Sequence, residues 1–106
     1  MKRCVWKTHD ILHQVEHANS FYTRFKGLLG RSGLGVDAGL LITPCSSVHT
    51  LGMRFPIGVV FLEGDYTICR IVPVLSPGRL SPWVPRAKHV LEVNPELLQQ
   101  YPLAVG

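Results

Sequence analysis

The sequence predicts a single, mainly β domain, and three observations support that prediction. The chain has 106 residues, which suits one domain around one hydrophobic core. Hydrophobic residues make up 46% and charged residues only 17%, a balance that excludes a disordered chain. Eight prolines and ten glycines divide the sequence into many short segments with many turns, which favours strands over a helical bundle.

The N-terminal segments are short, and their pattern leaves two interpretations open. Residues 4–8 and 11–18 can form two strands joined by a turn at His9-Asp10. The second segment also fits a helix, because four apolar residues share one helical face: Ile11, Leu12, Val15 and Ala18. Periodicity does not decide between a strand and a helix here.

Residues 20–30 are predicted to form an amphipathic helix. Its stripe follows the spacing of one helical face and consists of Phe21, Arg24, Phe25, Leu28 and Leu29. Ser20 is a suitable N-cap, and Gly30 can supply the left-handed residue that ends the helix. We therefore expect Phe25 to be buried against the β body.

The middle of the chain contains short apolar runs that predict strands. A strand over residues 40–43 ends at Pro44. Residues 57–62 are apolar on both faces apart from Gly58, which is typical of a buried strand. Gly64-Asp65 is a turn signal, so residues 57–62 and 66–75 are predicted to form a hairpin.

The C-terminal part alternates between loop, strand and helix signals. Residues 76–85 contain three prolines around Trp83, which predicts an ordered loop that carries the tryptophan against the body. Residues 88–93 are predicted to form another strand. Asn94-Pro95 is typical of a helix start, so a short helix is expected at about residues 95–100.

Two segments resemble a known family. The first has the spacing A-x5-R-x2-GL-x2-R, from Ala18 to Arg31, and the second runs from His49 to Leu62 as HTLGMRFPIGVVFL. Both resemble the bacterial and archaeal family called domain of unknown function 192, from about Cys4 to Gly106. The resemblance favours strands in the N-terminal segments. It implies a small β-sandwich or flattened barrel of about seven short strands, with the helix at 20–30 over an open end.

The sequence departs from the family pattern at two places. The pattern typically has an aspartate where this chain has Gly58. Its loss argues against a simple acid–base enzyme, or equally indicates a structural aspartate that caps backbone groups and is replaced here by other contacts. The resemblance also implies an acidic residue and a last strand after Gly106. A single domain over residues 1–106 that lacks this strand would expose a sheet edge and permit an edge-strand dimer.

The predicted core follows from the helical stripe and the apolar strands. Its members are Phe21, Phe25, Leu28, Leu41, Ile57, Val59, Phe61, Ile68, Val72, Val90 and Leu91.

Charge and cysteine content limit the class of partner. The formal net charge is +4 and the pI is about 9.3, but no run of positive residues exceeds two, so a nucleic-acid partner is not expected.

The three cysteines are an odd number without framework spacing. No apolar signal-peptide core follows the basic N-terminus, and no segment approaches the ~20 apolar residues of a membrane span. These features predict a reduced, cytoplasmic protein with no membrane partner.

Two sets of potential metal ligands have i, i+4, i+8 spacing. His9, His13 and His17 would share one face of a helix, but on a strand i and i+4 are ~13 Å apart. Cys45, His49 and Met53 are soft ligands that suit Cu(I), and the first two also resemble a nucleophile and its base. We expect no metal and no cofactor. A small enzyme or metallochaperone that uses Cys45, His49 and Met53 is the alternative.

The arginines point to an anion site. Arg54 lies inside the densest motif, where a structural loop has no need of a guanidinium. We predict that His49, Met53 and Arg54 line a partly apolar pocket, with Arg79 or Arg24 within reach of a shared anion.

The predicted function is that of a non-enzymatic binding module. Its site would be formed by loops 45–56 and 76–85 and would take a small anionic ligand or a protein segment. The sequence contains no catalytic triad, no carboxylate set for a hard metal and no cofactor loop, so an enzyme is not expected.

Overall fold

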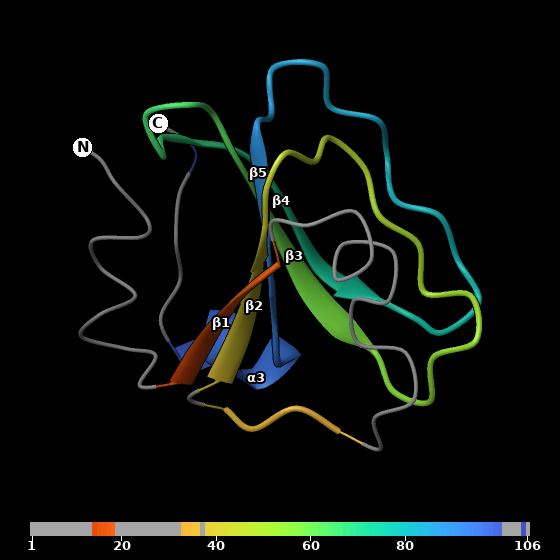
Figure 1. Cartoon of the computed structure of the whole chain (residues 1–106). Coiled ribbons are helices and arrows are strands. Elements are labelled where there is room, and N and C mark those ends of the chain that lie inside the picture. Colours follow the sequence, from red (N-terminus) through yellow and green to blue (C-terminus); the bar gives the residue numbers. More distant parts are fainter. Residues whose placement is uncertain (1–13, 19–32, 37, 101–104, 106) are drawn as a thin grey trace.

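The computed structural model describes residues 14–18, 33–36, 38–100 and 105. These residues form one open sheet of five strands with a short helix against it (Figure 1). In chain order the elements are β1 (Gln14–Ala18), β2 (Ala38–Ile42), β3 (Ile57–Leu62), β4 (Ile68–Leu75), β5 (His89–Val93) and α3 (Pro95–Gln100).

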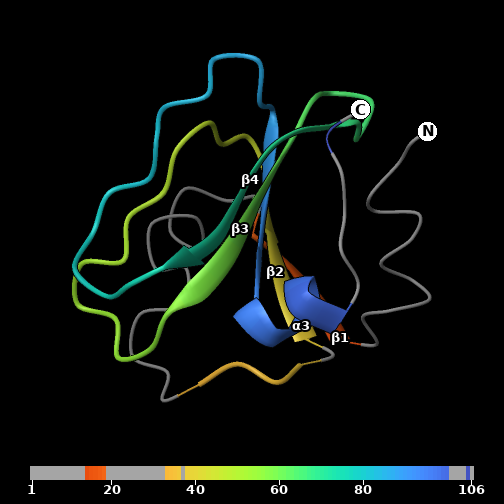
Figure 2. The same ribbon diagram turned by 180° about the vertical axis from the view of Figure 1, so that it is seen from behind.

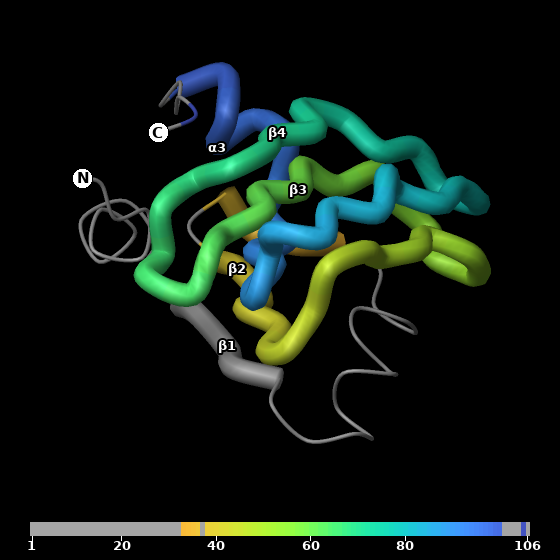
Figure 3. The backbone as a smooth tube through the Cα atoms, turned by 90° about the horizontal axis from the view of Figure 1, so that it is seen from above, coloured from red at the N-terminus to blue at the C-terminus, as the bar shows by residue number. Residues whose placement is uncertain are grey.

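The sheet has the strand order β1-β2-β5-β3-β4. Figure 3 shows β3 and β4 side by side. Pairing is antiparallel between β2 and β5, β5 and β3, and β3 and β4. Only the edge pair is parallel, with Gln14 of β1 opposite Ala38 of β2. The last strand in sequence, β5, therefore lies at the centre of the sheet.

The mainly β fold and the short C-terminal helix are confirmed. In the described residues the strands form one open sheet of five, and not the predicted sandwich or barrel of about seven. Residues 14–18 are a strand, in agreement with the strand interpretation of that segment. The predicted strand at 4–8 and the predicted helix at 20–30, with Phe21, Phe25 and Leu28, lie outside the described residues.

The two central strands are buried on both faces. All six residues of β3 and all five of β5 are buried. The first buried cluster, which we call the loop face, consists of Leu40, Ile42, Met53, Ile57, Val59, Phe61, Leu75, Val84, Ala87 and Val90. The second, the helix face, consists of Leu41, Val60, Leu62, Ile68, Leu91, Val93, Leu97 and Leu98. Figure 2 shows α3 against the sheet.

Most of the predicted core that falls on described residues is confirmed. The buried members are Leu41, Ile57, Val59, Phe61, Ile68, Val90 and Leu91. Val72 is half-buried, because it lies on β4, the outermost strand on its side of the sheet.

The hairpin loop between β3 and β4 is longer than the predicted two-residue turn. Glu63 N donates to Thr67 O at 2.9 Å, and Tyr66 has a φ of 70°. A left-handed third residue is typical of a three-residue hairpin loop, so β4 begins at Ile68 and not at Tyr66. The ring of Tyr66 stacks on that of His89 at 4.3 Å, which gives a bulky residue a reason to occupy this position.

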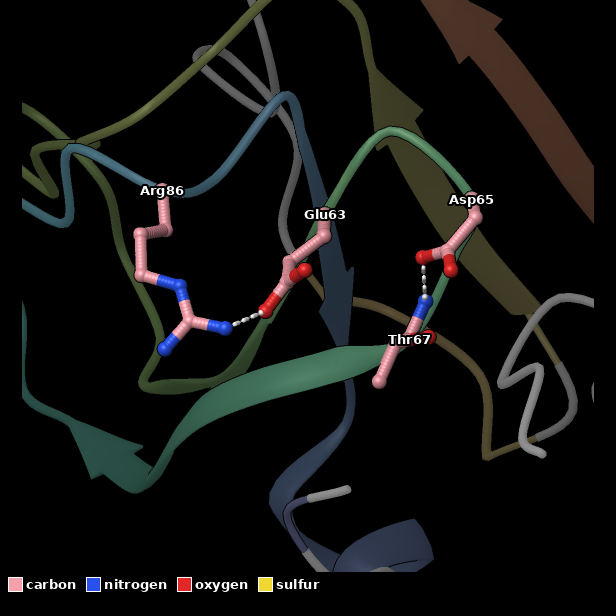
Figure 4. A network of polar contacts seen from close by, with 4 residues as sticks. All are labelled: Glu63, Asp65, Thr67 and Arg86. Carbon is pink, nitrogen blue, oxygen red and sulfur yellow. Dashed lines mark hydrogen bonds and ion pairs between the residues drawn. The ribbon is translucent and has the colours of Figure 1, made fainter.

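Polar contacts fix this end of the sheet (Figure 4). Asp65 Oδ1 accepts a hydrogen bond from Thr67 N at 3.0 Å, and Glu63 forms an ion pair with Arg86. Because the Arg86 side chain is 77% exposed, this ion pair contributes little stability.

The start of α3 has the predicted cap. Asn94 Oδ1 accepts a hydrogen bond from Glu96 N at 2.9 Å, and the Asn94 side-chain amide donates to Leu34 O at 2.7 Å. One amide side chain therefore caps the helix and ties the segment before β2 to the end of β5.

Candidate binding surface

The loops after β2 and after β4 run side by side (Figures 1 and 2). We call residues 45–56 and 76–85 the paired loops. Their main-chain links are Thr50 N to Arg79 O at 2.8 Å, Ser81 N to Val48 O at 2.9 Å and Val84 N to Ser46 O at 2.8 Å, with a β-bridge between His49 and Leu80. The two segments that were predicted to form one site are thus a single hydrogen-bonded unit.

Thr50 is the centre of this unit. Its side chain is completely buried, and Oγ1 donates to Ser76 O at 2.6 Å. The same oxygen accepts from Arg79 N at 2.9 Å, while Gly78 N donates to Thr50 O at 2.8 Å. A buried hydroxyl that both donates and accepts holds the two loops in one relative position.

A tight turn connects Thr50 to the core. Met53 N donates to Thr50 O at 3.1 Å, and Gly52 has a φ of 81°, a conformation that glycine adopts without steric cost. The turn places Met53 in the loop face together with Val84 and Ala87. Buried residues from both loops therefore anchor the unit on the sheet.

The outer side of the paired loops exposes large apolar side chains. Leu51 is 52% exposed, Leu80 72% and Trp83 70%. The prediction that Trp83 packs against the body is wrong. Its neighbour Val84 takes the inward position in the loop face, so the tryptophan projects outward.

The charges of the paired loops have one sign. Arg54 and Arg79 are exposed, and neither loop contains an aspartate or a glutamate. His49 is half-buried, and its Nδ1 accepts a hydrogen bond from Leu51 N at 3.2 Å. The surface combines apolar side chains with guanidinium groups.

The structure places four of the five predicted site residues on the paired loops. His49 and Arg79 are brought close, because Arg79 O binds the amide of the residue after His49. Met53 is in the core, whereas Arg54 and Arg79 are at the surface. Arg24 lies outside the described residues. A shared anion pocket for these residues stays a prediction.

A hollow of about 350 Å³ lies where β5 ends, beside the last two residues of the first paired loop. Its lining consists of Gly33, Leu34, Phe55, Pro56, Asn94, Pro95 and Glu96. None of the predicted site residues belongs to this lining. The walls are mostly apolar, and both amide atoms of Asn94 already have hydrogen-bond partners.

The alternative ligand set is spread over different environments. Cys45 Sγ donates to Ser47 O at 3.0 Å, His49 Nδ1 binds a backbone amide, and Met53 is buried. Within the described part of the chain, no group of three or more His, Cys, Asp or Glu side chains is arranged to hold a metal ion. No helix among the described residues is long and apolar enough to cross a membrane.

Sequence reasoning missed Glu92 as a residue of interest. It is 3% exposed and pairs with Leu40 on β2 and Val59 on β3, so it shares the loop face with them. Its Oε1 is buried and has no hydrogen-bond partner among the described residues. Burial raises the pKa of Glu92 to about 7. The available signal was a single carboxylate between Leu91 and Val93 in an otherwise apolar strand.

Comparisons with known proteins agree with this architecture. The family model described as "Uncharacterized ACR, COG1430" (DUF192) matches residues 4–106. A protein of unknown function from Novosphingobium aromaticivorans DSM 12444 is 22% identical, with a TM-score of 0.78 over 87% of this chain and 70% of that chain. A "putative transcription regulator" from Sinorhizobium meliloti 1021 is 23% identical, with a TM-score of 0.74 over 87% and 76%. At these identities the likeness shows the fold alone. No curated protein matches the chain.

Proposed function

The chain belongs to the family called domain of unknown function 192, and from that premise we propose that it is a non-enzymatic binding module whose paired loops hold its partner. Binding residues commonly lie on loops that a rigid scaffold positions. Here the scaffold is the buried sheet, and the loops rise from two of its connections.

One observation supports the proposal: internal hydrogen bonds and buried side chains hold the paired loops in place, while large apolar side chains on the same loops are exposed. Thr50 and the buried residues Met53 and Val84 fix the loops, while Leu51, Leu80 and Trp83 are more than half exposed. A surface fixed before binding loses little conformational freedom when a partner docks. Exposed tryptophan and arginine are the side chains that contribute most at protein interfaces.

These features support a protein segment as the partner more than a small anion. A small anion needs the guanidinium groups but makes no use of two exposed leucines and a tryptophan. A protein segment covers both kinds of side chain. Leu51, Leu80 and Trp83 on one ordered unit offer apolar area that a docked segment can bury.

The test is selection of binding peptides against the full-length chain. A random peptide library displayed on phage is selected on wild-type protein, and the recovered peptides are measured by fluorescence anisotropy. We expect the double variant Leu80→Ser/Trp83→Ser to bind these peptides at least about tenfold more weakly, a loss of about 1.4 kcal/mol. Val74→Ser is the matched control, because Val74 is 51% exposed but lies on β4.

A second pair of variants tests whether order in the loops matters. Thr50→Val removes the hydroxyl and leaves Arg79 N and Ser76 O unpaired, whereas Thr50→Ser keeps it. We expect only the valine variant to weaken binding. The proposal is contradicted if the library yields no binder, or if the recovered peptides bind the double variant as tightly as wild type.

A further inference from the structure

We propose that the paired loops recognise an acidic protein segment, one in which carboxylate side chains stand next to a bulky apolar side chain. This inference rests on the proposed function and specifies the chemistry of its partner. It is argued from the charges of the loops, from their apolar residues and from the position of the acids elsewhere on the molecule.

The two loop sequences carry positive charge only. Residues 45–56 and 76–85 contain Arg54 and Arg79 and no acidic residue, so nothing on the loops neutralises these two cations. Both side chains are exposed. The described acids with exposed or half-exposed side chains lie outside the two loops. Glu63 and Asp65 are at the turn between β3 and β4, where Glu63 is already paired with Arg86. Glu96 is on α3 and lines a hollow together with Phe55 and Pro56 at the end of the first loop.

The positions of the cations matter as well as their number. Arg79 immediately precedes Leu80, and its backbone is held by Thr50. The backbone of Arg79 is therefore fixed, next in sequence to an exposed leucine. A planar guanidinium binds a carboxylate through two parallel hydrogen bonds, which an apolar or neutral polar segment does not offer.

The apolar side chains distinguish a peptide from other polyanions. Single-stranded nucleic acid also binds surfaces that combine arginine with an aromatic residue, because bases stack on the ring. Leu51 and Leu80 offer no stacking face, and only two arginines are present on the loops. Aliphatic side chains next to a cation fit a peptide with alternating apolar and acidic residues.

The experiment uses the full-length chain and three short fluorescein-labelled peptides. The first alternates glutamate and leucine, the second replaces glutamate by glutamine, and the third replaces leucine by serine. We expect the glutamate–leucine peptide to bind at least about tenfold more tightly than either of the others. Its affinity is expected to fall as salt is raised, because salt screens exposed charges.

Matched variants test whether the preference for the glutamate–leucine peptide depends on the position of the arginine. Arg79→Ala is expected to weaken the glutamate–leucine peptide by about tenfold and to leave the glutamine–leucine peptide unchanged. Arg70→Ala removes the same charge from an exposed position on β4 and is expected to have little effect. Trp83→Ala is expected to weaken both leucine-containing peptides.

Each other outcome contradicts the inference in its own way. Equal losses for Arg70→Ala and Arg79→Ala would show an effect of net charge alone. Tight binding of the glutamine–leucine peptide would remove the acidic specificity and leave the proposed function intact. Preference for a labelled oligothymidine would assign the surface to nucleic acid. Self-association in sedimentation experiments, lost in Arg79→Ala, would identify a second copy as the partner.

Discussion

Glu92 lies on the central strand β5 between apolar neighbours on both sides. Leu40 and Val59 face it across the two strand pairs, and its Oε1 has no hydrogen-bond partner among the described residues. An ionised carboxylate at such a position costs several kcal/mol, so the side chain keeps its proton to a higher pH than usual. Burial raises the pKa of Glu92 to about 7 from an ordinary value of 4.5.

The stability of the protein should therefore depend on pH through Glu92. The pKa of Glu92 is higher in the folded state than in the unfolded state. The contribution of its protonated carboxyl to the free energy of unfolding is therefore full below about pH 4.5 and is lost as the pH rises through about 7. The difference corresponds to roughly 3 kcal/mol at most. Glu92→Gln removes this dependence, and urea unfolding at several pH values measures it.

The expected result is a difference between variants that changes with pH. Glu92→Gln should match wild type near pH 4 and be more stable at pH 8. Glu96→Gln is the control, because Glu96 is exposed on α3 and should shift neither curve. A wild-type stability that stays constant relative to Glu92→Gln across this range would show that the carboxyl is ionised or solvated when folded.

At the scale of the elements, Leu98 of α3 packs so closely against Gly58 of β3 that a larger residue at position 58 would clash with it. A Cβ at Gly58 would lie 2.6 Å from Leu98 Cδ1 and 3.2 Å from Pro73 O. The resemblance to the family implies an aspartate at this position. In this chain a leucine of the helix takes the space next to the strand, so Gly58 and Leu98 are sterically coupled.

A double-mutant cycle tests this contact. Gly58→Ala should lower the free energy of unfolding by about 1–3 kcal/mol, because the methyl group overpacks the site. Gly58→Asp should cost more, since its carboxylate would be buried against Leu98 and Val93. Leu98→Ala should cost less in the Gly58→Ala background than in wild type. Additive costs would show that the alanine methyl is accommodated elsewhere.

Local signals predicted the elements better than their arrangement. The apolar run 57–62 and the cap at Asn94 predicted β3 and the start of α3, because both depend on neighbouring residues alone. The central place of β5 and the pairing of the loops depend on residues about 30 to 50 positions apart in sequence, for which one sequence gives no periodic signal. The Trp83 prediction failed because a proline-rich loop does not indicate which side chain turns inward.

The candidate site was predicted in part for the same reason. Loops 45–56 and 76–85 were expected to act together, and the structure joins them through Thr50, a residue without any special sequence signal. Glu92 was overlooked because a single acid in a strand is ordinarily assigned to a solvent-facing position. Its burial follows only from the strand order, which places β5 between two neighbours.

At the scale of the molecule, the sheet connects two buried clusters that face opposite ways. The paired loops pack on one through Met53 and Val84, and α3 packs on the other through Leu97 and Leu98. Both clusters share the strands β3 and β5. Small domains built around one shared sheet usually unfold in a single cooperative transition.

Damage to the helix face should therefore also loosen the paired loops. Leu97→Ala should lower the free energy of unfolding by about 2–5 kcal/mol, as for other truncations in a core. Hydrogen exchange should show equal losses of protection for the amides of Val90 and Thr50. Gln99→Ala, at an exposed position of α3, is the control. An unchanged Thr50 amide would show that the loops open independently of the sheet.

The strand order also has a consequence during synthesis. The strand that joins β2 to β3 occupies residues 89–93 and is made after β2, β3 and β4. While these residues remain inside the ribosome, the β2 and β3 edges that β5 will occupy are without a partner, and the apolar residues of β3 lack one of their two neighbouring strands. The sheet therefore closes only after β5 has emerged, and until then two unpaired strand edges are exposed to aggregation.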